Sequence, residues 1–283
     1  MNNNINNSPL GFYLAGLIEG DGSIWTSNTL KSSYGRIHNP QIALSFHADD
    51  LPLFQHIKEI FGAGGLYMEK KRKAGIYRIS DLNTLIEIIN LINGKFRTPK
   101  IRYLHKAIDR INLIYNLNIE KLPLDTSDLG STPWLAGFTD ADGNFHISLE
   151  GIYGLNGSRL RGRVKCTFSI NQRIIDKPTG LSCVPFMTEI ADLFKCNINF
   201  PKGNVMALVA GANSKHFLTK LYFNEFPLMG SKWLNYLSFL QGLDYLGKSL
   251  TSEEISEVQN IKNSMNNKRT GYSWDHLKDF YIK

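Results

Sequence analysis

Two segments with the apolar spacing of a short helix organise the chain. They are residues 14–22, LAGLIEGDG, and residues 135–143, LAGFTDADG, and the residues after each alternate as in a strand. The glycine that closes each segment is a typical C-terminal stop for a helix. Because the same pattern occurs twice, it indicates that the chain is built from two similar halves.

The periodicity after each segment predicts the remaining helices and hairpins in the same order. In the first half the expected elements are a hairpin within residues 24–46, a helix that begins at 49–50 and stops at Gly62, a hairpin at 66–79, and helices at 81–92 and 101–113. In the second half they are a longer hairpin with a loop at 151–158, a helix at 181–194, a hairpin at 197–209, a helix at 214–223 and a polar helix at 251–267. The expected fold is α+β, with pseudo-symmetric αββαββα halves at residues 1–116 and 133–283, a linker at 117–132 and a C-terminal helical extension.

Small residues lie four positions apart in both helical segments, at Gly16 and Gly20 and at Gly137 and Ala141. Residues four apart share one face of a helix. Glycine inside a helix costs about 1 kcal/mol relative to alanine, so a repeated small face indicates close packing against another backbone. Neither segment is long enough to span a bilayer, and the expected partner of each helix is therefore the other one.

Packing the two helices side by side would bring their C-terminal ends together, and with them Asp21 and Asp142. A carboxylate at a helix C-terminus is unfavourable by about 0.3–1 kcal/mol, and two nearby carboxylates repel each other. A divalent cation relieves both costs, and Mg²⁺ prefers such oxygen ligands. One segment alone would more simply be a capped helix with its aspartate in water, but the repetition favours a metal site. Glu19 and Asp140 lie roughly 200° around the helix from these aspartates, which predicts a structural role for both.

Both segments resemble the signature of the LAGLIDADG homing endonucleases, in the form that carries two motifs on one chain. The resemblance implies a monomer whose motif helices pack together and whose two antiparallel sheets form a saddle over double-stranded DNA. It also implies that an intron-encoded endonuclease hydrolyses one phosphodiester in each strand of a long, non-palindromic site. Two or three divalent ions would be held by Asp21 and Asp142 together with the backbone carbonyls of Gly20 and Ala141.

The same resemblance places a basic residue beside the active site of each half, and Lys100 and Lys232 match it. A lysine there can stabilise phosphoryl charge or tune a water molecule, although capping a turn or contacting a phosphate is an alternative role. In the family, polar residues at the end of a strand help to position water, and Asn171 and Gln172 correspond to them. The matching first-half stretch, residues 47–50, departs from this pattern. The two half-sites therefore need not be equally efficient.

Basic residues at period-two spacing are the strongest binding signal. Arg159, Arg161, Arg163 and Lys165 all point to one face of an expected strand. A solvated basic face is the simpler explanation, whereas a strand in the major groove would use guanidinium groups to read guanine and bind phosphate. Further expected DNA contacts are Lys70, Lys71, Arg72, Lys73 and Arg78 in a basic hairpin, Trp25, Ser27, Arg36, Asn39 and Gln41 in the first sheet, and Asn144, His146, Ser148 and Lys202 in the second half.

Composition adds a few constraints. The chain has 283 residues, a formal net charge of +7 and a pI of 9.2, which favours a polyanionic partner. No apolar run approaches the roughly 18 residues of a transmembrane helix, and the N-terminus lacks the pattern of a signal or transit peptide, so no membrane association is expected. The three cysteines show no metal-ligand spacing. The Asn- and Ile-rich composition is typical of an A/T-rich genome and favours an organellar, mitochondrial setting.

A non-cleaving nucleic-acid binder on the same scaffold is the main alternative, above all a maturase that acts on intron RNA. Loss of the motif carboxylates would favour this function, and both are present. A LAGLIDADG-like transcription regulator is a weaker alternative, because the chain shows no pattern for an additional domain.

Overall fold

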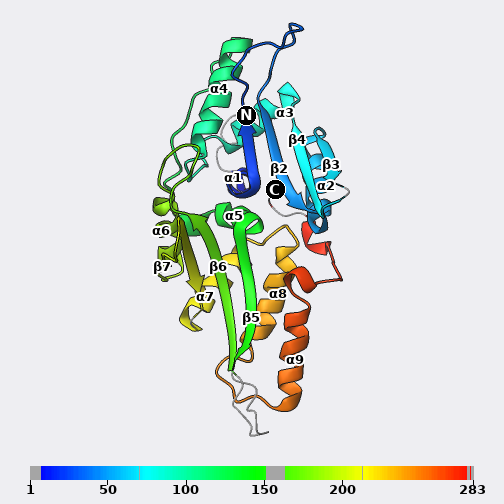
Figure 1. The fold of residues 1–283 in the computed structure, drawn as a ribbon, viewed down its shortest axis with the longest axis vertical. Coiled ribbons are helices and arrows are strands. Elements are labelled where there is room, and N and C mark those ends of the chain that lie inside the picture. The colour runs from blue at the N-terminus through cyan, green and yellow to red at the C-terminus, as the bar shows by residue number, and fades with distance from the viewer. Residues whose placement is uncertain (1–7, 70, 151–162, 212, 279–280, 282–283) are drawn as a thin grey trace.

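Helices α1 (Pro9–Asp21) and α5 (Trp134–Asp142) lie side by side at the centre of the molecule, with one antiparallel sheet on either side of the pair (Figure 1). The computed structural model describes residues 8–69, 71–150, 163–211, 213–278 and 281. The molecule is elongated, with the first half at one end and the second half at the other. The two motif helices therefore join the halves.

Both halves follow the expected order of elements. After α1 come β1 (Gly22–Trp25), β2 (Gln41–His47), α2 (Leu51–Phe61), β3 (Gly65–Glu69), β4 (Ala74–Ile79), α3 (Leu82–Ile92) and α4 (Ile101–Tyr115). After α5 come β5 (Gly143–Glu150), β6 (Arg163–Arg173), α6 (Val184–Leu193), β7 (Ile198–Asn199), β8 (Val205–Ala210), α7 (Asn213–Glu225), α8 (Lys232–Leu243) and the additional helix α9 (Ser252–Asn263). The α+β fold with two four-stranded antiparallel sheets is confirmed.

The two sheets share one topology and one register relative to their motif helices. Their strand orders are β1-β2-β4-β3 and β5-β6-β8-β7. Gly22, directly after α1, pairs with Leu44, and Gly143, directly after α5, pairs with Ile170. Leu44 and Ile170 are therefore equivalent positions. This equivalence corrects the sequence-based match of residues 47–50 with Asn171 and Gln172, because the strand register makes Ser45 and Phe46 their counterparts, two residues earlier.

Each sheet buries one face against helices and leaves the other face exposed. In the second half, Phe145 on β5 lies at the centre of an aromatic cluster on the buried face, with ring centroids of Phe168, Phe223 and Phe239 at 5.1, 5.5 and 5.4 Å. Asn144, the preceding residue, is exposed on the opposite face. The strands thus pack one face against helices and present the other face to solvent.

The backbones of α1 and α5 touch because small residues line their shared face. A Cβ atom added to Gly16 would overlap the carbonyl oxygen of Trp134, and one added to Gly137 would overlap the carbonyl oxygen of Tyr13. Both obstacles are backbone atoms, which cannot turn away as a flexible side chain can. The expected packing of the halves through their motif helices is confirmed.

Each motif helix ends at its closing glycine, as expected, but neither glycine has the left-handed conformation that is common at such positions. Gly22 and Gly143 have φ angles of −88° and −79° and are the first residues of their strands. A Cβ on Gly22 would lie 2.7 Å from the carbonyl oxygen of Ile18, and one on Gly143 would lie 2.9 Å from that of Thr139. Glycine is required here because the strand leaves directly over the last helical turn.

The expected hairpin within residues 24–46 is present, since β1 pairs antiparallel with β2, and a long loop at residues 26–40 with one isolated bridge between Lys31 and Ile37 joins the strands. One other expectation differs from the structure. The polar helix expected at 251–267 is shorter, as α9 ends at Asn263. The expected loop at 151–158 lies outside the described residues.

The segment after α9 returns to the centre of the molecule and contacts the first half. The Tyr272 hydroxyl donates a hydrogen bond to Asp49 Oδ2 at 2.6 Å. The ring of Tyr281 stacks on that of Tyr13 with centroids 5.3 Å apart, and Leu277 is buried. This segment therefore adds contacts between the halves beyond the helix pair. Within the described part of the chain, no helix has the length and apolar character needed to cross a membrane.

Candidate active site

Asp21 and Asp142 end the two packed helices and lie close together. A Cβ on Gly20 would be 3.5 Å from Asp142 Oδ2, so the end of α1 directly adjoins this carboxylate. The pKa of Asp21 is raised to about 6, chiefly by burial and also by the charge of Asp142, while Lys232 and Lys100 oppose the shift. Burial also raises the pKa of Asp142. The structure thus brings together the two carboxylates that the motif spacing singled out.

The raised pKa of Asp21 predicts a pH-dependent cost of folding without metal. A carboxyl whose pKa rises from 3.8 to about 6 on folding contributes stability at low pH that is lost as the pH rises through 6. The Asp21→Asn protein lacks this titration. In EDTA, its melting temperature relative to that of the wild type is therefore expected to increase from about pH 4 to about pH 7. A constant difference across this range in thermal unfolding would contradict the shift.

Lys100 and Lys232 lie directly at the ends of the motif helices. Lys100 Nζ donates hydrogen bonds to the carbonyl oxygens of Gly20 and Gly22, both at 2.8 Å, and Lys232 Nζ donates to that of Ala141. An ammonium group is favourable at the negative end of a helix dipole. Burial lowers the pKa of both lysines, and the nearby carboxylates oppose this shift.

The same carbonyl oxygens of Gly20 and Ala141 are those that the family resemblance assigns to metal binding. Here each accepts a hydrogen bond from a lysine. A carbonyl oxygen has two lone pairs, so a lysine contact leaves one of them for a metal ion. Among the described residues there is no group of three or more His, Cys, Asp or Glu side chains that could hold a metal. A site with two carboxylates still fits Mg²⁺, which commonly binds one or two carboxylates and completes its shell with water and phosphate oxygens.

The two half-sites differ next to their aspartates. Gln172 Nε2 donates a hydrogen bond to Asp142 Oδ2 at 2.6 Å. By the strand register, the equivalent first-half position is Phe46, which is buried and stacks on Phe54 with ring centroids 4.3 Å apart. Asp21 therefore has a phenyl ring where Asp142 has an amide donor, a difference that the out-of-register sequence match could not identify.

The LAGLIDADG endonuclease family pattern matches residues 14–109 and 135–243. The chain belongs to this family. It is 31% identical over 316 residues to Intron-encoded DNA endonuclease aI3 of Saccharomyces cerevisiae, which covers 99% of this chain and 75% of that protein. It is also 28% identical over 265 residues to an uncharacterized cox1 intron-2 37.2 kDa protein of Schizosaccharomyces pombe, covering 90% of this chain and 72% of the relative.

Solved structures of LAGLIDADG proteins have the same fold. The I-LtrWI LAGLIDADG homing endonuclease bound to target DNA matches with a TM-score of 0.69 and 22% identity, over 94% of this chain and 100% of that chain. The likeness to Intron-encoded RNA maturase bI4 of Saccharomyces cerevisiae is more limited, at 26% identity over 163 residues, 58% of this chain and 22% of that protein.

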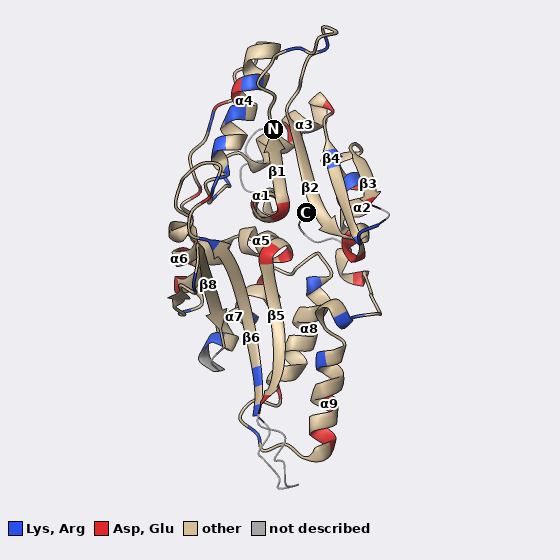
Figure 2. Cartoon of the chain, viewed as in Figure 1, with Lys and Arg blue, Asp and Glu red and all other residues tan. Residues whose placement is uncertain are grey.

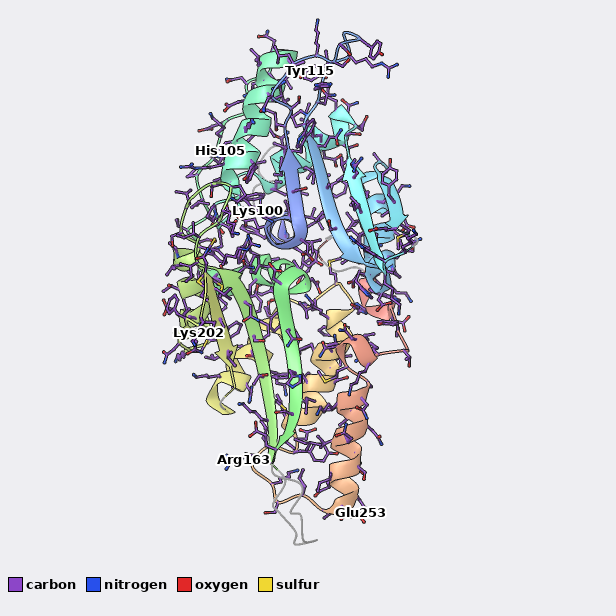
Figure 3. The ribbon with its side chains drawn as sticks, in the orientation of Figure 1. Lys100, His105, Tyr115, Arg163, Lys202 and Glu253 are labelled. Carbon is purple, nitrogen blue, oxygen red and sulfur yellow. The ribbon has the colours of Figure 1, made fainter. Side chains whose placement is uncertain are left out.

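In this LAGLIDADG chain, the polar residues expected on the second sheet lie on its exposed face. Strand register places Ser148 opposite Lys165 and Glu150 opposite Arg163. Val164, between the two basic residues, is buried. The other expected contacts in this half are exposed, at Asn144 and His146 on β5 and at Lys202 in the turn before β8. Figure 3 shows Arg163 at the far end of β6 and Lys202 near the other edge of the sheet. Arg159 and Arg161 lie outside the described residues.

Only some of the DNA contacts expected in the first half have exposed side chains. The face of the first sheet presents the side chains of Trp25, Gln41 and Arg78, while Arg36 in the β1–β2 loop and Lys71, Arg72 and Lys73 in the β3–β4 turn are also exposed or partly exposed. Ser27 differs: it is buried, and its hydroxyl is 3.1 Å from His38 Nδ1. Asn39 Oδ1 accepts a hydrogen bond from the Tyr115 hydroxyl at 2.6 Å. These two polar groups stabilise the loop. Lys70 lies outside the described residues.

The motif spacing did not identify a polar cavity of about 380 Å³ beside Lys232 and Asn144. Its lining includes Asp50 from the first half and Arg269 and Tyr272 from the segment after α9. Figure 2 shows basic residues of the C-terminal segment near the centre of the molecule. Because these residues come from distant parts of the chain, no local spacing marks them in the sequence.

Proposed function

We propose that this protein is an intron-encoded homing endonuclease that makes a double-strand break at a long, non-palindromic DNA site. The observation that carries the proposal is the pairing of Asp21 and Asp142 at adjoining helix ends, between the exposed polar faces of two equivalent sheets. Two equivalent halves match the two strands of a duplex, so each half would hydrolyse one phosphodiester. The likeness to an intron-encoded DNA endonuclease and to a DNA-bound homing endonuclease supports this reaction.

In this reaction Asp21 and Asp142 hold two or three divalent ions, for which Mg²⁺ is the proposed metal. The carbonyl oxygens of Gly20 and Ala141 are further ligands. Mg²⁺ held there would polarise the phosphoryl group, lower the pKa of water and stabilise the leaving oxygen. With carboxylate oxygens from both halves, the protein supplies part of the ligand shell and leaves positions for DNA and water.

Lys100 and Lys232 contribute positive charge next to the reacting phosphates. Their ammonium groups are held at the helix ends and are partly desolvated, which strengthens their interaction with negative charge that develops on phosphoryl oxygens. Gln172 orients Asp142 through its amide N–H and retains a carbonyl oxygen that can accept a hydrogen bond from water. With Phe46 at the equivalent first-half position, only the Asp142 side has this amide, so the two strands are cleaved at unequal rates.

The proposed DNA interface is the exposed face of both sheets, with the first half at residues 1–116 and the second at 133–283, joined by a linker at 117–132. A single chain then contains both catalytic halves and acts as a monomer. Relatives from introns, one of them a cox1 intron, support an intron-borne gene, and we propose an organellar, mitochondrial setting.

A maturase that binds intron RNA without cutting DNA is the second candidate, supported by the partial likeness to an RNA maturase. Incubation with a supercoiled plasmid library separates the two functions. We expect linear products in Mg²⁺ and none in EDTA, with breaks that map to one site. Specific binding of the intron RNA with no cleavage of any library member would favour the maturase.

The exposed basic pair on β6 is expected to contribute to DNA recognition. Arg163→Ala and Lys165→Ala should each weaken DNA binding. The loss of one phosphate contact lowers affinity for all sequences and reduces the salt slope by about one. The loss of a bidentate base contact instead costs about 1–3 kcal/mol at one position of the site. Lys165 Nζ lies 3.9 Å from Glu150 Oε1 in an exposed ion pair. Exposed ion pairs are weak, so this one should not prevent Lys165 from contacting DNA.

Binding measured against a library of one-base target variants at several salt concentrations distinguishes the two roles. Lys220→Ala is the matched control, because Lys220 is an exposed lysine on α7, which packs on the buried side of the second sheet. Unchanged affinity and salt slope in both β6 variants would show that DNA does not lie on this face.

A further inference from the structure

Glu19 contacts the segment that carries Lys100 in the first half. Its buried carboxylate accepts hydrogen bonds from the backbone N–H of Arg97 at 3.0 Å and from that of Thr98 at 2.6 Å. The Thr98 hydroxyl donates a further hydrogen bond to it at 2.6 Å. The same hydroxyl oxygen accepts one from the backbone N–H of Lys100 at 3.3 Å. A short chain of hydrogen bonds thus links Glu19 to the start of α4, where Lys100 lies.

Asp140 makes the equivalent contacts in the second half. Its Oδ2 atom accepts hydrogen bonds from the backbone N–H of Met229 at 2.8 Å and from that of Gly230 at 3.1 Å. These residues precede Lys232 by three and two positions, as Arg97 and Thr98 precede Lys100. Both motif acids therefore bind the same part of the lysine-bearing segment, although one is a glutamate and the other an aspartate.

Each of these acids is also held by an aromatic side chain of the opposite half. Trp134 Nε1 donates a hydrogen bond to Glu19 Oε2 at 2.7 Å, and the Tyr13 hydroxyl donates one to Asp140 Oδ2 at 2.7 Å. Tyr13 and Trp134 are equivalent, because each directly precedes the first leucine of its motif. The arrangement is reciprocal: the motif helix of one half is hydrogen-bonded to the acid that holds the lysine segment of the other.

We propose that Glu19 and Asp140 are positioning residues that hold Lys100 and Lys232, respectively, at the helix ends, and that Trp134 and Tyr13 align them across the interface. The inference rests on the proposed function, since it assumes that each lysine serves one strand. A misplacement of about 1 Å can slow an enzymatic step by about 10²-fold. Loss of one acid should therefore slow the strand served by its own lysine and leave the other strand much less affected.

Strand-resolved cleavage tests this inference. The substrate is the selected duplex target with a different label on each strand, cut in Mg²⁺ under single-turnover conditions at saturating protein. Lys100→Met and Lys232→Met first identify the strand that each lysine serves. Glu19→Gln is expected to slow the Lys100 strand, and Asp140→Asn the Lys232 strand, each by about 10- to 100-fold, with DNA affinity unchanged.

Tyr13→Phe is the second variant for the Asp140 side, because it removes only the hydroxyl group and keeps the stacked ring. It should slow the Lys232 strand several-fold even if Asp140→Asn does not fold. Asp109→Asn, in an exposed ion pair on α4, is the control and should leave the ratio of the two strand rates unchanged.

A folded Glu19→Gln or Tyr13→Phe protein that slows both strands equally, or neither, would overturn the inference, because a purely structural role cannot select a strand. Normal cleavage of both strands by the two lysine variants would overturn the role assigned to the lysines, and the inference with it. A wild-type protein that cuts neither strand would instead overturn the proposed function.

Discussion

An Asp142→Asn protein is expected to bind its DNA target and to lose double-strand cleavage, by about 10²- to 10³-fold or more if several kcal/mol of transition-state stabilisation depend on metal binding. The amide keeps the size of the side chain but lacks the charge that holds a cation. Asp21→Asn should have the same effect on double-strand products, since neither half can replace the other. Cleavage is measured on plasmid and duplex targets in Mg²⁺.

Binding and folding controls separate this loss from a general defect. Phosphate contacts on the two sheets are expected to dominate affinity, so mobility shifts in EDTA should show nearly normal binding. Thermal unfolding should show no loss of stability at neutral pH, because each substitution removes one of two repelling carboxylates. Efficient cleavage by the Asp21→Asn, Asp142→Asn double variant, or by wild type in excess EDTA, would show that the paired carboxylates do not hold a catalytic metal.

The centre of the fold could be predicted from the sequence because it breaks local rules in the same way twice. Gly16 and Gly137 are unfavourable inside helices, and Asp21 and Asp142 are unfavourable at helix C-termini. Such conflicts are expected where function or close packing requires them. The periodicity of the remaining segments then placed most helices and strands within a few residues.

Contacts between distant segments could not be predicted in this way. Sequence alone placed Gln172 near the site, but the strand register was needed to show that it donates to Asp142 and that Phe46 is its counterpart. Glu19 was expected to have a structural role, yet its partners in the α4 segment and on α5 follow from tertiary packing. The motif glycines were correctly expected to end their helices, but the close exit of the strand that requires glycine there follows from the tertiary structure.

Gly137→Leu is expected to damage activity more than any other single change in the interface between the halves. Overpacking typically costs about 1–3 kcal/mol, and the cost here should lie at the upper end because the added carbon meets the backbone of Tyr13. Relief requires α1 and α5 to move apart, which also separates Asp21 from Asp142. Cleavage of both strands should therefore fall by more than the loss in melting temperature alone would suggest.

The matched control is Gly271→Leu, since a Cβ at Gly271 meets no atom within 4 Å. This variant adds the same side chain at a site with room for it and should keep normal melting and cleavage. A second test is Gly137→Ala, which adds only the overlapping carbon and should show a smaller loss of the same kind. Each variant is compared by thermal unfolding and by cleavage below its melting temperature. The proposed metal site needs both aspartates, and they stay together only while the backbones touch. A Gly137→Leu protein with wild-type melting and cleavage is therefore incompatible with this interface.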